Sequence, residues 1–251
     1  MSEQYLFPFK TDLSTVYIPK QLNNPFGKDI PTIAKVAAKE FKDFISDASQ
    51  NWDYDFEKQR GKMFGVLVVQ IQEGGFGYLG TVSGKFADTV QCKEMIPSVF
   101  EVSMGDYFIN SGMTELTNIG KRINKMTVPS EIENAKEERR LKSIALQRRL
   151  FEHYRFLNTS GIEKNIIEIF EEGNHGDPPA AAGECAAPKL LQYALAHQLK
   201  PIAIAEFWWG KPKEQKNSGT DIFYPACKDR CRPILEWMLE DGGLYEKGSF
   251  S

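Results

Sequence analysis

Runs of apolar residues with two different periods divide the first part of the chain into one helix and a strand hairpin. Over residues 32–48, apolar positions recur at helical spacing, which predicts a helix with one buried face. Residues 61–72 are β-branched and almost continuously apolar, and they therefore predict a buried strand. The glycine-rich turn EGGFG then leads into residues 76–86, which predict the partner strand of a hairpin.

Helical patterns dominate the middle of the chain. Residues 129–158 form the most strongly helical segment and carry many charges. Residues 87–128 show no sustained period, and we expect loop and short helix there. Residues 200–209, KPIAIAEFWW, alternate and then run apolar, which predicts a central strand.

Two further helices are predicted on either side of that strand. The first covers residues 184–198 and should begin near Cys185, because Pro188 is tolerated only in a first helical turn. The second covers about residues 226–239, where Pro233 would kink it.

These elements predict an α/β fold, a three-layer sandwich with a helical arm inserted. The strands near Val66 and Ile204 are expected to lie in one sheet with helices on its faces. The predicted divisions are an extended N-terminal segment (1–30), the first part of the α/β domain (31–128), the charged helical arm (129–158) and the second part of the α/β domain with the cysteines (159–251).

Composition narrows the class of protein without indicating a partner. Hydrophobic residues make up 41% and charged residues 26% of the chain, as in ordinary soluble globular proteins. The net charge of −3 gives no general argument for a nucleic-acid or membrane partner, and no apolar run approaches the ~20 residues that span a bilayer. The N-terminus lacks the pattern of a secretory signal, and the few, unevenly spaced cysteines do not resemble a disulfide framework. We therefore expect a cytoplasmic protein with reduced thiols.

Three cysteines, Cys185, Cys227 and Cys231, lie at or near predicted helix starts. A helix N-terminus lowers the pKa of a nearby thiol, and the four-residue spacing of the last two places them on one helix face. Three sulfur ligands with one open position are typical of a catalytic zinc site, so zinc is the expected cofactor and His175 could fill the fourth position. The alternative is that these thiols are buried for packing alone, as we expect for Cys92.

The order helix, strand, helix around these cysteines resembles the cytidine-deaminase fold. In that zinc-dependent family the first ligand opens one helix, a strand follows, and a Pro-Cys pair opens the next helix. Two features depart from the family. PACKDRC stands where P-C-x-x-C is usual, and Ala187 stands where the family has its general acid/base Glu, two residues after the first ligand. Glu184 lies on the other side of Cys185 and cannot take over this role, so we expect no deamination of cytidine or adenosine.

Two further groups of residues are candidates for binding. The first consists of four arginines in the arm: Arg139, Arg140, Arg148 and Arg149. They fit either a solvated helix face or a surface that contacts RNA phosphates. The second group consists of residues that could form the wall of a small-molecule pocket: Glu184, Trp208 and Trp209.

Several long blocks of the sequence resemble the N-terminal extension of bacterial RluA-type RNA pseudouridine synthases. They are GKMFGVLVV, ALQRRLFEHYRFLN, PPAAAGECAAPKLLQYA, KPIAIAEFWWG and FYPACKDRCRPILEWML, and the match covers most of residues 25–239. In that family the extension carries a longer charged arm, and the catalytic domain that follows uses an Asp in an H-R-L-D motif. This chain has no such motif and stops soon after residue 239, so we expect either a stand-alone extension or a fragment of a longer protein.

The resemblance implies an accessory domain of a pseudouridine synthase that acts in RNA modification and is not itself catalytic. Its partner would be RNA or an RNA-modifying enzyme, although the acidic overall balance counts against strong unaided RNA binding. Two alternatives stay open: a zinc-dependent deaminase-fold protein that acts on a nucleoside or nucleic acid, and a small-molecule binding domain. The sequence therefore leaves undecided whether the chain is an enzyme.

Overall fold

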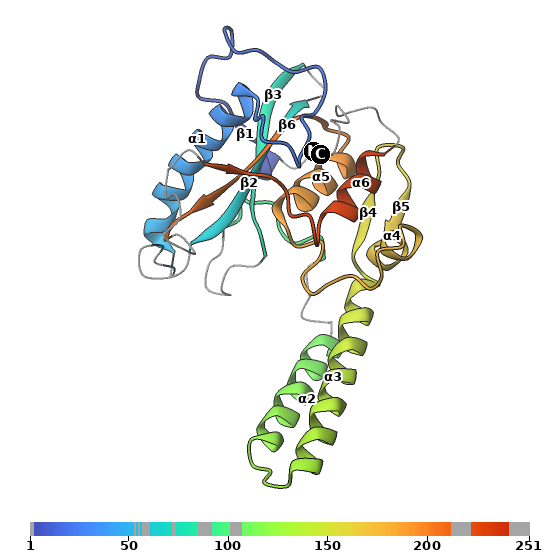
Figure 1. The fold of residues 1–251 in the computed structure, drawn as a ribbon. Helices are drawn as coiled ribbons and strands as arrows, with labels where there is room; N and C mark the ends of the chain where they lie inside the picture. The colour runs from blue at the N-terminus through green and yellow to red at the C-terminus, as the bar shows by residue number, and fades with distance from the viewer. Residues whose placement is uncertain are drawn as a thin grey trace.

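Within the part of the chain that the structure describes, an antiparallel sheet with helices on both faces forms the body of the protein. Figure 1 shows this mixed α/β arrangement in the computed structural model. The strand order is β1-β3-β2-β6-β7, with bounds Phe7–Pro8 (β1), Gly75–Val82 (β3), Lys62–Ile71 (β2), Lys200–Trp209 (β6) and Phe223–Tyr224 (β7). The described residues are 3–52, 54, 56, 61–71, 74–84, 92–100, 107–211 and 222–240.

The central strands confirm both the predicted hairpin and the predicted shared sheet. β2 pairs antiparallel with β3 along most of its length. On its other edge β2 pairs antiparallel with β6, where Val66 lies opposite Ala205 and Leu67 opposite Ile204. The segments near Val66 and Ile204 therefore lie side by side in one sheet, and their apolar side chains are buried from both faces.

Helix α1 (Thr32–Ala48) covers one face of the sheet, and α5 (Ala186–Ala196) covers the other. On the α1 face, the Phe41 ring lies edge-on to the rings of Phe64 and Phe207. This approach depends on Gly80, because a Cβ there would lie 2.3 Å from the Phe41 ring. Other described helices of the body are the short 3-10 helix η2 after α1 (Ser49–Asn51), α6 beside α5 (Arg232–Leu239) and α4 beside α6 (Ile166–Glu172).

Residues 3–30, the described part of the predicted N-terminal segment, run over the body. After the 3-10 helix η1 (Glu3–Tyr5), β1 pairs with β3 at one edge of the sheet. Further along, the Asn23 side chain donates to and accepts from the backbone of Ile204, at 3.1 and 2.8 Å. The carbonyl of Pro25 accepts a hydrogen bond from the Ala226 amide at 2.8 Å. The segment thereby holds the chain just ahead of Cys227.

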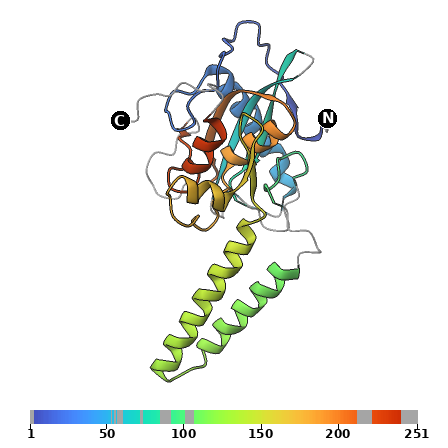
Figure 2. The same ribbon diagram turned by 90° about the vertical axis from the view of Figure 1, so that its right-hand side faces the viewer.

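A hairpin of two helices, α2 (Tyr107–Ile123) and α3 (Pro129–Phe151), projects from the body (Figures 1 and 2). The prediction of loop and short helix was wrong over α2, and the predicted arm therefore began too late. α2 buries Leu116 and Ile119, one turn apart, while polar residues surround them. Ile109 and Ile123, both partly buried, continue this stripe at helical spacing, so α2 is as amphipathic as α1 and its helical signal was overlooked in the sequence. Residues 87–91 and 101–106 of the same predicted region lie outside the described residues.

The arm also ends earlier than residue 158. After α3 the chain forms β4 (Arg155–Leu157), which pairs antiparallel with β5 (Glu163–Asn165). Tyr154 and Phe156 are buried and Arg155 between them is exposed, which is the period of a strand and not of a helix. None of the described helices, α3 included, combines the length and apolar character that crossing a membrane requires.

Candidate metal centre

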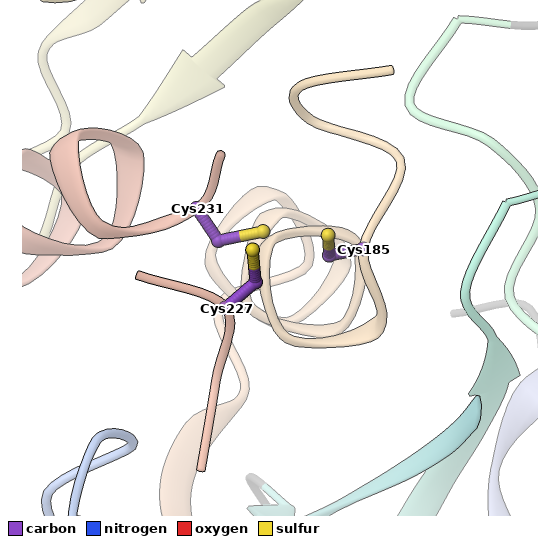
Figure 3. A group of neighbouring side chains, drawn as sticks. All are labelled: Cys185, Cys227 and Cys231. Carbon is purple, nitrogen blue, oxygen red and sulfur yellow. The ribbon is translucent and has the colours of Figure 1, made fainter. Parts of the chain in front are cut away.

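The sulfur atoms of Cys185, Cys227 and Cys231 all lie within 4.8 Å of one another. Figure 3 shows the three side chains converging, the first from the start of α5 and the other two from the segment that leads into α6. Cys231 is buried, whereas the other two thiols are partly exposed. The predicted convergence of the three cysteines at two helix starts is confirmed.

Two glycines allow α5 to begin at this place. Gly65 on β2 lies beneath the first turn of the helix, where a Cβ would come within 2.7 Å of the Ala186 Cβ. Gly183 has a φ of 85°, in the left-handed region that favours glycine, and it turns the chain into the helix. Cys185 follows as the N-cap residue of α5, with extended backbone and no side-chain hydrogen bond to the helix. Its thiol is therefore free to face the other two.

Strand β7 brings Cys227 to the same place. The chain runs out along α5 and returns along β6, so the last residues of β6 lie beside the first turn of the helix. The 2.9 Å hydrogen bond from the Ala187 amide to the Glu206 carboxylate shows how close they are. β7 pairs with the same end of β6, with Tyr224 opposite Glu206. Three residues beyond Tyr224, Cys227 therefore lies at the start of α5.

The spacing of Cys227 and Cys231 arises from a turn and not from a helix, which corrects the predicted helix start near residue 226. α6 begins at Arg232, and Cys231 is its N-cap residue. The Cys231 amide donates to the Cys227 carbonyl at 3.3 Å and so closes the turn. Pro233 lies in the first turn of α6, where a missing N–H costs nothing, so it begins the helix and does not kink it.

Hydrogen bonds within the cluster set the ionisation of its thiols. The Cys231 thiol donates to the Cys227 sulfur, and with the amides of Arg230 and Asp229 it lowers the pKa of Cys227 to about 5, against the opposing effect of burial. The pKa of Cys231 is raised, because its thiol is hydrogen-bonded to Cys185 and Cys227 and is buried. By contrast, burial raises the pKa of Cys92, away from the cluster, to about 12.

The three cysteines fit a zinc ion in donor type and in spacing. Thiolates are the ligands that zinc prefers in sites of this size, and one of the three is already stabilised as a thiolate. Two sulfurs on a tetrahedral zinc lie about 3.8 Å apart, given a zinc–sulfur distance of about 2.3 Å. The observed limit of 4.8 Å is close enough for small thiol rotations to make up the difference.

Sequence reasoning missed Glu206, a buried carboxylate on β6 beside the cluster. Only 7% of the residue is exposed, and burial raises the pKa of its carboxyl to about 7. Oε1 accepts the hydrogen bond from the Ala187 amide. The charge of the carboxylate interacts with both Cys227 and Cys231. The available signal was a single acidic residue within an otherwise apolar strand, at a position that faces the side of α5.

The two positions compared with the deaminase family have different surroundings. Ala187 stands at the position where that family has a carboxylate. It is buried, and its backbone amide donates a hydrogen bond to the Glu206 carboxylate. Glu184 is also buried, but its carboxylate accepts hydrogen bonds from the Ser98 hydroxyl at 2.9 Å and from the Tyr154 hydroxyl. Its two oxygens are therefore engaged by residues outside the cysteine cluster.

The other candidate ligand and pocket residues are not brought together. His175 is not in the group of donor atoms around the cysteines, and its ring lies edge-on to the Phe170 ring. Trp209 packs against the hydrophobic cluster on the α1 face, and its neighbour Trp208 donates from Nε1 to the Lys211 carbonyl at 3.1 Å. Neighbouring strand residues point to opposite faces, so the two tryptophans do not form one wall with Glu184.

The four arginines lie along α3, exposed but with contacts inside the chain. Arg139 donates to the Leu116 carbonyl at 3.3 Å, and Arg149 lies over the Phe108 ring at 4.1 Å. Arg140 pairs with Glu137 at 2.7 Å. Arg148 pairs with carboxylates beyond the arm: Glu171 at 3.0 Å and Asp177 at 3.5 Å.

Comparison with known proteins gave no family model, no curated protein and no solved structure that matches this chain. The resemblances noted from the sequence therefore stay predictions. Function has to be inferred from the side chains that the fold brings together, which are the three cysteines and Glu206.

Proposed function

We propose that this chain is a zinc-binding protein in which Cys185, Cys227 and Cys231 are the metal ligands. The observation that carries the proposal is the convergence of the three sulfurs within 4.8 Å. Buried thiols that merely pack do not need a shared hydrogen-bond cluster with a stabilised thiolate, whereas metal ligands must lose their protons. Zinc held by three protein ligands acts as a Lewis acid toward a molecule in its fourth position.

The order of elements supports the finer proposal of a cytidine-deaminase-like site. The first cysteine opens α5, β6 follows, and a pair of cysteines precedes α6. This is the order that the deaminase family uses for its metal ligands. Since Ala187 stands where that family has its carboxylate, the proposal is limited to metal binding at a site of catalytic type.

Metal analysis of the purified protein tests this proposal. We expect about one zinc per chain in protein purified without chelators, because the site has one set of ligands. Cys185→Ser and Cys231→Ser should each reduce the zinc content at least about tenfold, since three ligands become two. Cys92→Ser, which changes a cysteine outside the cluster, should retain it. Wild-type protein that is free of zinc, and takes up none when it is added in equimolar amount, would contradict the proposal.

As a second candidate we propose an accessory role in RNA modification, with the arm in contact with RNA. Its support is the projecting α2–α3 hairpin, which carries exposed arginines on α3, together with the sequence resemblance to the synthase extension. Arg140 and Arg148 already pair with carboxylates, so RNA phosphates would compete with those exposed ion pairs.

RNA binding at low salt tests the second candidate. The unmodified protein is compared with a variant that carries glutamate at four positions: Arg139, Arg140, Arg148 and Arg149. Binding should weaken and its dependence on salt should flatten, because fewer counterions are released. A variant with Lys35→Glu and Lys39→Glu, two exposed positions on α1, is the control. Absence of binding by the unmodified protein would remove the RNA contact.

A further inference from the structure

The position of Glu206 connects the sheet to the cysteine cluster. On β6, Ala205 and Phe207 belong to the α1 side of the sheet, so Glu206 between them faces α5. Its cross-strand neighbour is Gly65, and a Cβ on Gly65 would lie 3.5 Å from Cγ of Glu206. The absence of a side chain at Gly65 thus leaves room for the carboxylate beneath the first turn of α5.

One oxygen of this buried carboxylate has a partner and the other does not. Oε1 accepts from the Ala187 amide, and Oε2 has no hydrogen-bond donor among the described residues. Oε2 is not among the enclosed side-chain atoms that lack a partner in the described part of the chain, so it reaches the surface of the site and is open to a hydrogen-bond donor on a bound molecule. The Ala187 amide that holds Oε1 lies two residues after Cys185 at the start of α5, which places the carboxylate beside the proposed metal centre. Its charge also interacts with Cys227 and Cys231.

We propose that Glu206 is an outer group of this metal centre and selects the molecule that binds at the fourth coordination position. Its unpartnered oxygen accepts a hydrogen bond from that molecule, and its negative charge disfavours anions there. The proposal rests on the proposed zinc site. It assigns to the site a preference for small neutral ligands that carry a hydrogen-bond donor.

A direct bond from Glu206 to the metal fits the geometry less well. The donor atoms within 4.8 Å of one another are the three sulfurs alone, and the Glu206 oxygens are outside this group. A carboxylate ligand on the same zinc would lie about 3.5 Å from each sulfur. Glu206 is also held by the Ala187 amide, which fixes it at the start of α5.

A role limited to capping α5 leaves half of the carboxylate unexplained. Cys185, the N-cap residue, makes no side-chain hydrogen bond to the helix, so Glu206 does supply a cap from the strand. That cap uses one oxygen and needs no charge, and a glutamine would satisfy it equally. The cap leaves Oε2 and the acidity of the group without a role, so capping alone does not account for a carboxylate beside the three sulfurs.

Cobalt(II) substitution provides a test that needs no knowledge of the substrate. The thiolate-to-cobalt charge-transfer absorption reports the number of sulfur ligands, and the d–d bands report the fourth position. Azide and imidazole are the probes, one anionic and one neutral with an N–H donor. Glu206→Gln keeps the shape and the cap but removes the charge. Glu40→Gln removes a buried carboxylate on the opposite face of the sheet and is the matched control.

We expect wild-type cobalt protein to bind imidazole more tightly than azide. At pH 8, above the pKa of about 7 of the Glu206 carboxyl, the charge-transfer intensity of Glu206→Gln should be unchanged, while azide binds about tenfold more tightly because a nearby like charge is gone. The Glu206→Gln substitution should change the affinity for imidazole only slightly, by no more than about twofold. Glu40→Gln should leave both affinities unchanged.

Three results would overturn the proposal, each in a different way. Equal azide affinities for wild type and Glu206→Gln would leave only the helix cap. A loss of metal or a new coordination spectrum in Glu206→Gln would make Glu206 a direct ligand. Preference of the wild type for azide over imidazole would refute the selection even if the variant does not fold. Failure of the wild type to bind cobalt or zinc at all would instead refute the metal site itself.

Discussion

The body and the arm handle their charged groups in opposite ways. In the body, Glu184 and Glu206 are buried, and each is held by donors from other parts of the chain. In the arm, Arg140 and Lys142 are exposed and pair with carboxylates of the same hairpin. A buried charge is costly unless its partners are accurately placed, whereas an exposed ion pair contributes little. Chemistry that depends on position is therefore concentrated in the body, and the arm surface should tolerate change.

The sharpest expected contrast lies between two cysteines of the body. In chelator-treated protein at pH 7, iodoacetamide should alkylate Cys227 at least about a hundredfold faster than Cys92, because only the former is a thiolate there. The rate at Cys227 should be level above about pH 6 and should fall below about pH 5. Mass spectrometry of the alkylated peptides measures both rates.

The same ionisation has a definite sign in the stability of the protein. The pKa of Cys227 is lowered on folding from 9.0 to about 5, so its contribution to the free energy of unfolding is fully present above pH 9. That contribution is lost as the pH falls toward 5.

In the alkylation experiment, equal rates at Cys227 and Cys92 at pH 7 would show that the turn before α6 does not stabilise a thiolate.

Removal of zinc from the proposed metal centre should affect the body far more than the arm. With zinc at about 1,000 times its dissociation constant, binding adds about 4 kcal/mol to the free energy of unfolding. Chelation should therefore lower the thermal midpoint markedly, as measured by calorimetry. Hydrogen exchange should rise in α5 and α6 and stay unchanged in α2. An unchanged midpoint would argue that the cysteines hold no structural metal.

Adding one methyl group beneath α1 should destabilise the body. A Cβ at Gly80 would lie 2.3 Å from the Phe41 ring, so Gly80→Ala should lower the free energy of unfolding by about 2 kcal/mol through overpacking. Gly75→Ala is the control on the same strand, since its Cβ would meet only Ile71 at 3.5 Å. Denaturant unfolding measures both, and equal effects would contradict the close packing of α1 on the sheet.

The same substitution in the arm should have the opposite sign. Gly120 lies in α2, and a Cβ there would meet only Nε of Arg139, at an ordinary contact distance of 3.8 Å. Gly120→Ala should therefore raise helix stability by about 0.5–1 kcal/mol. Circular dichroism during thermal unfolding would detect it, and a loss of helicity would show that the arm is packed more tightly than its contacts indicate.

The smallest effect is expected from reversing charge on the arm surface. Glutamate at positions 139, 140, 148 and 149 should change the free energy of unfolding by no more than about 1 kcal/mol, because the ion pairs that are lost are exposed. The thermal midpoint at moderate salt is the measurement. A fall of more than about 10 °C would mean that these arginines hold the arm to the body.

The sequence predicted the elements whose signal is local and missed the features that depend on distant contacts. α1, the β2–β3 hairpin and β6 follow from their own apolar patterns. The convergence of the cysteines followed from their places near two predicted helix starts, although the second start was predicted too early. α2 is an exception, because its own apolar stripe from Ile109 to Ile123 is present in the sequence but was grouped with the irregular residues before it. Cys227 and Cys231 were assigned to one helix because they are four residues apart. The turn that the Cys231 amide closes on the Cys227 carbonyl has the same spacing as one turn of a helix.

Glu206 illustrates a further limit of sequence reasoning. An acidic residue in an apolar strand indicates a buried charge, but the pattern does not say which helix start lies above it. That depends on Gly65 and on the register of β6 against β2, which place the carboxylate under Ala187. The carboxylate that reaches the first turn of α5 at Ala187 therefore comes from the neighbouring strand and not from the helix itself.

The arm interrupts the sheet in sequence, because β2 and β3 precede it and β6 follows it. As the chain leaves the ribosome, α2 and α3 can pair through local contacts. At that stage one edge of β2 is unpaired, because β6 has not yet been synthesised. Such an apolar open edge is prone to wrong pairing with other chains during synthesis. Cys185 emerges before β6 and Cys227 after it, so the proposed metal centre can form only once β6 has joined the sheet.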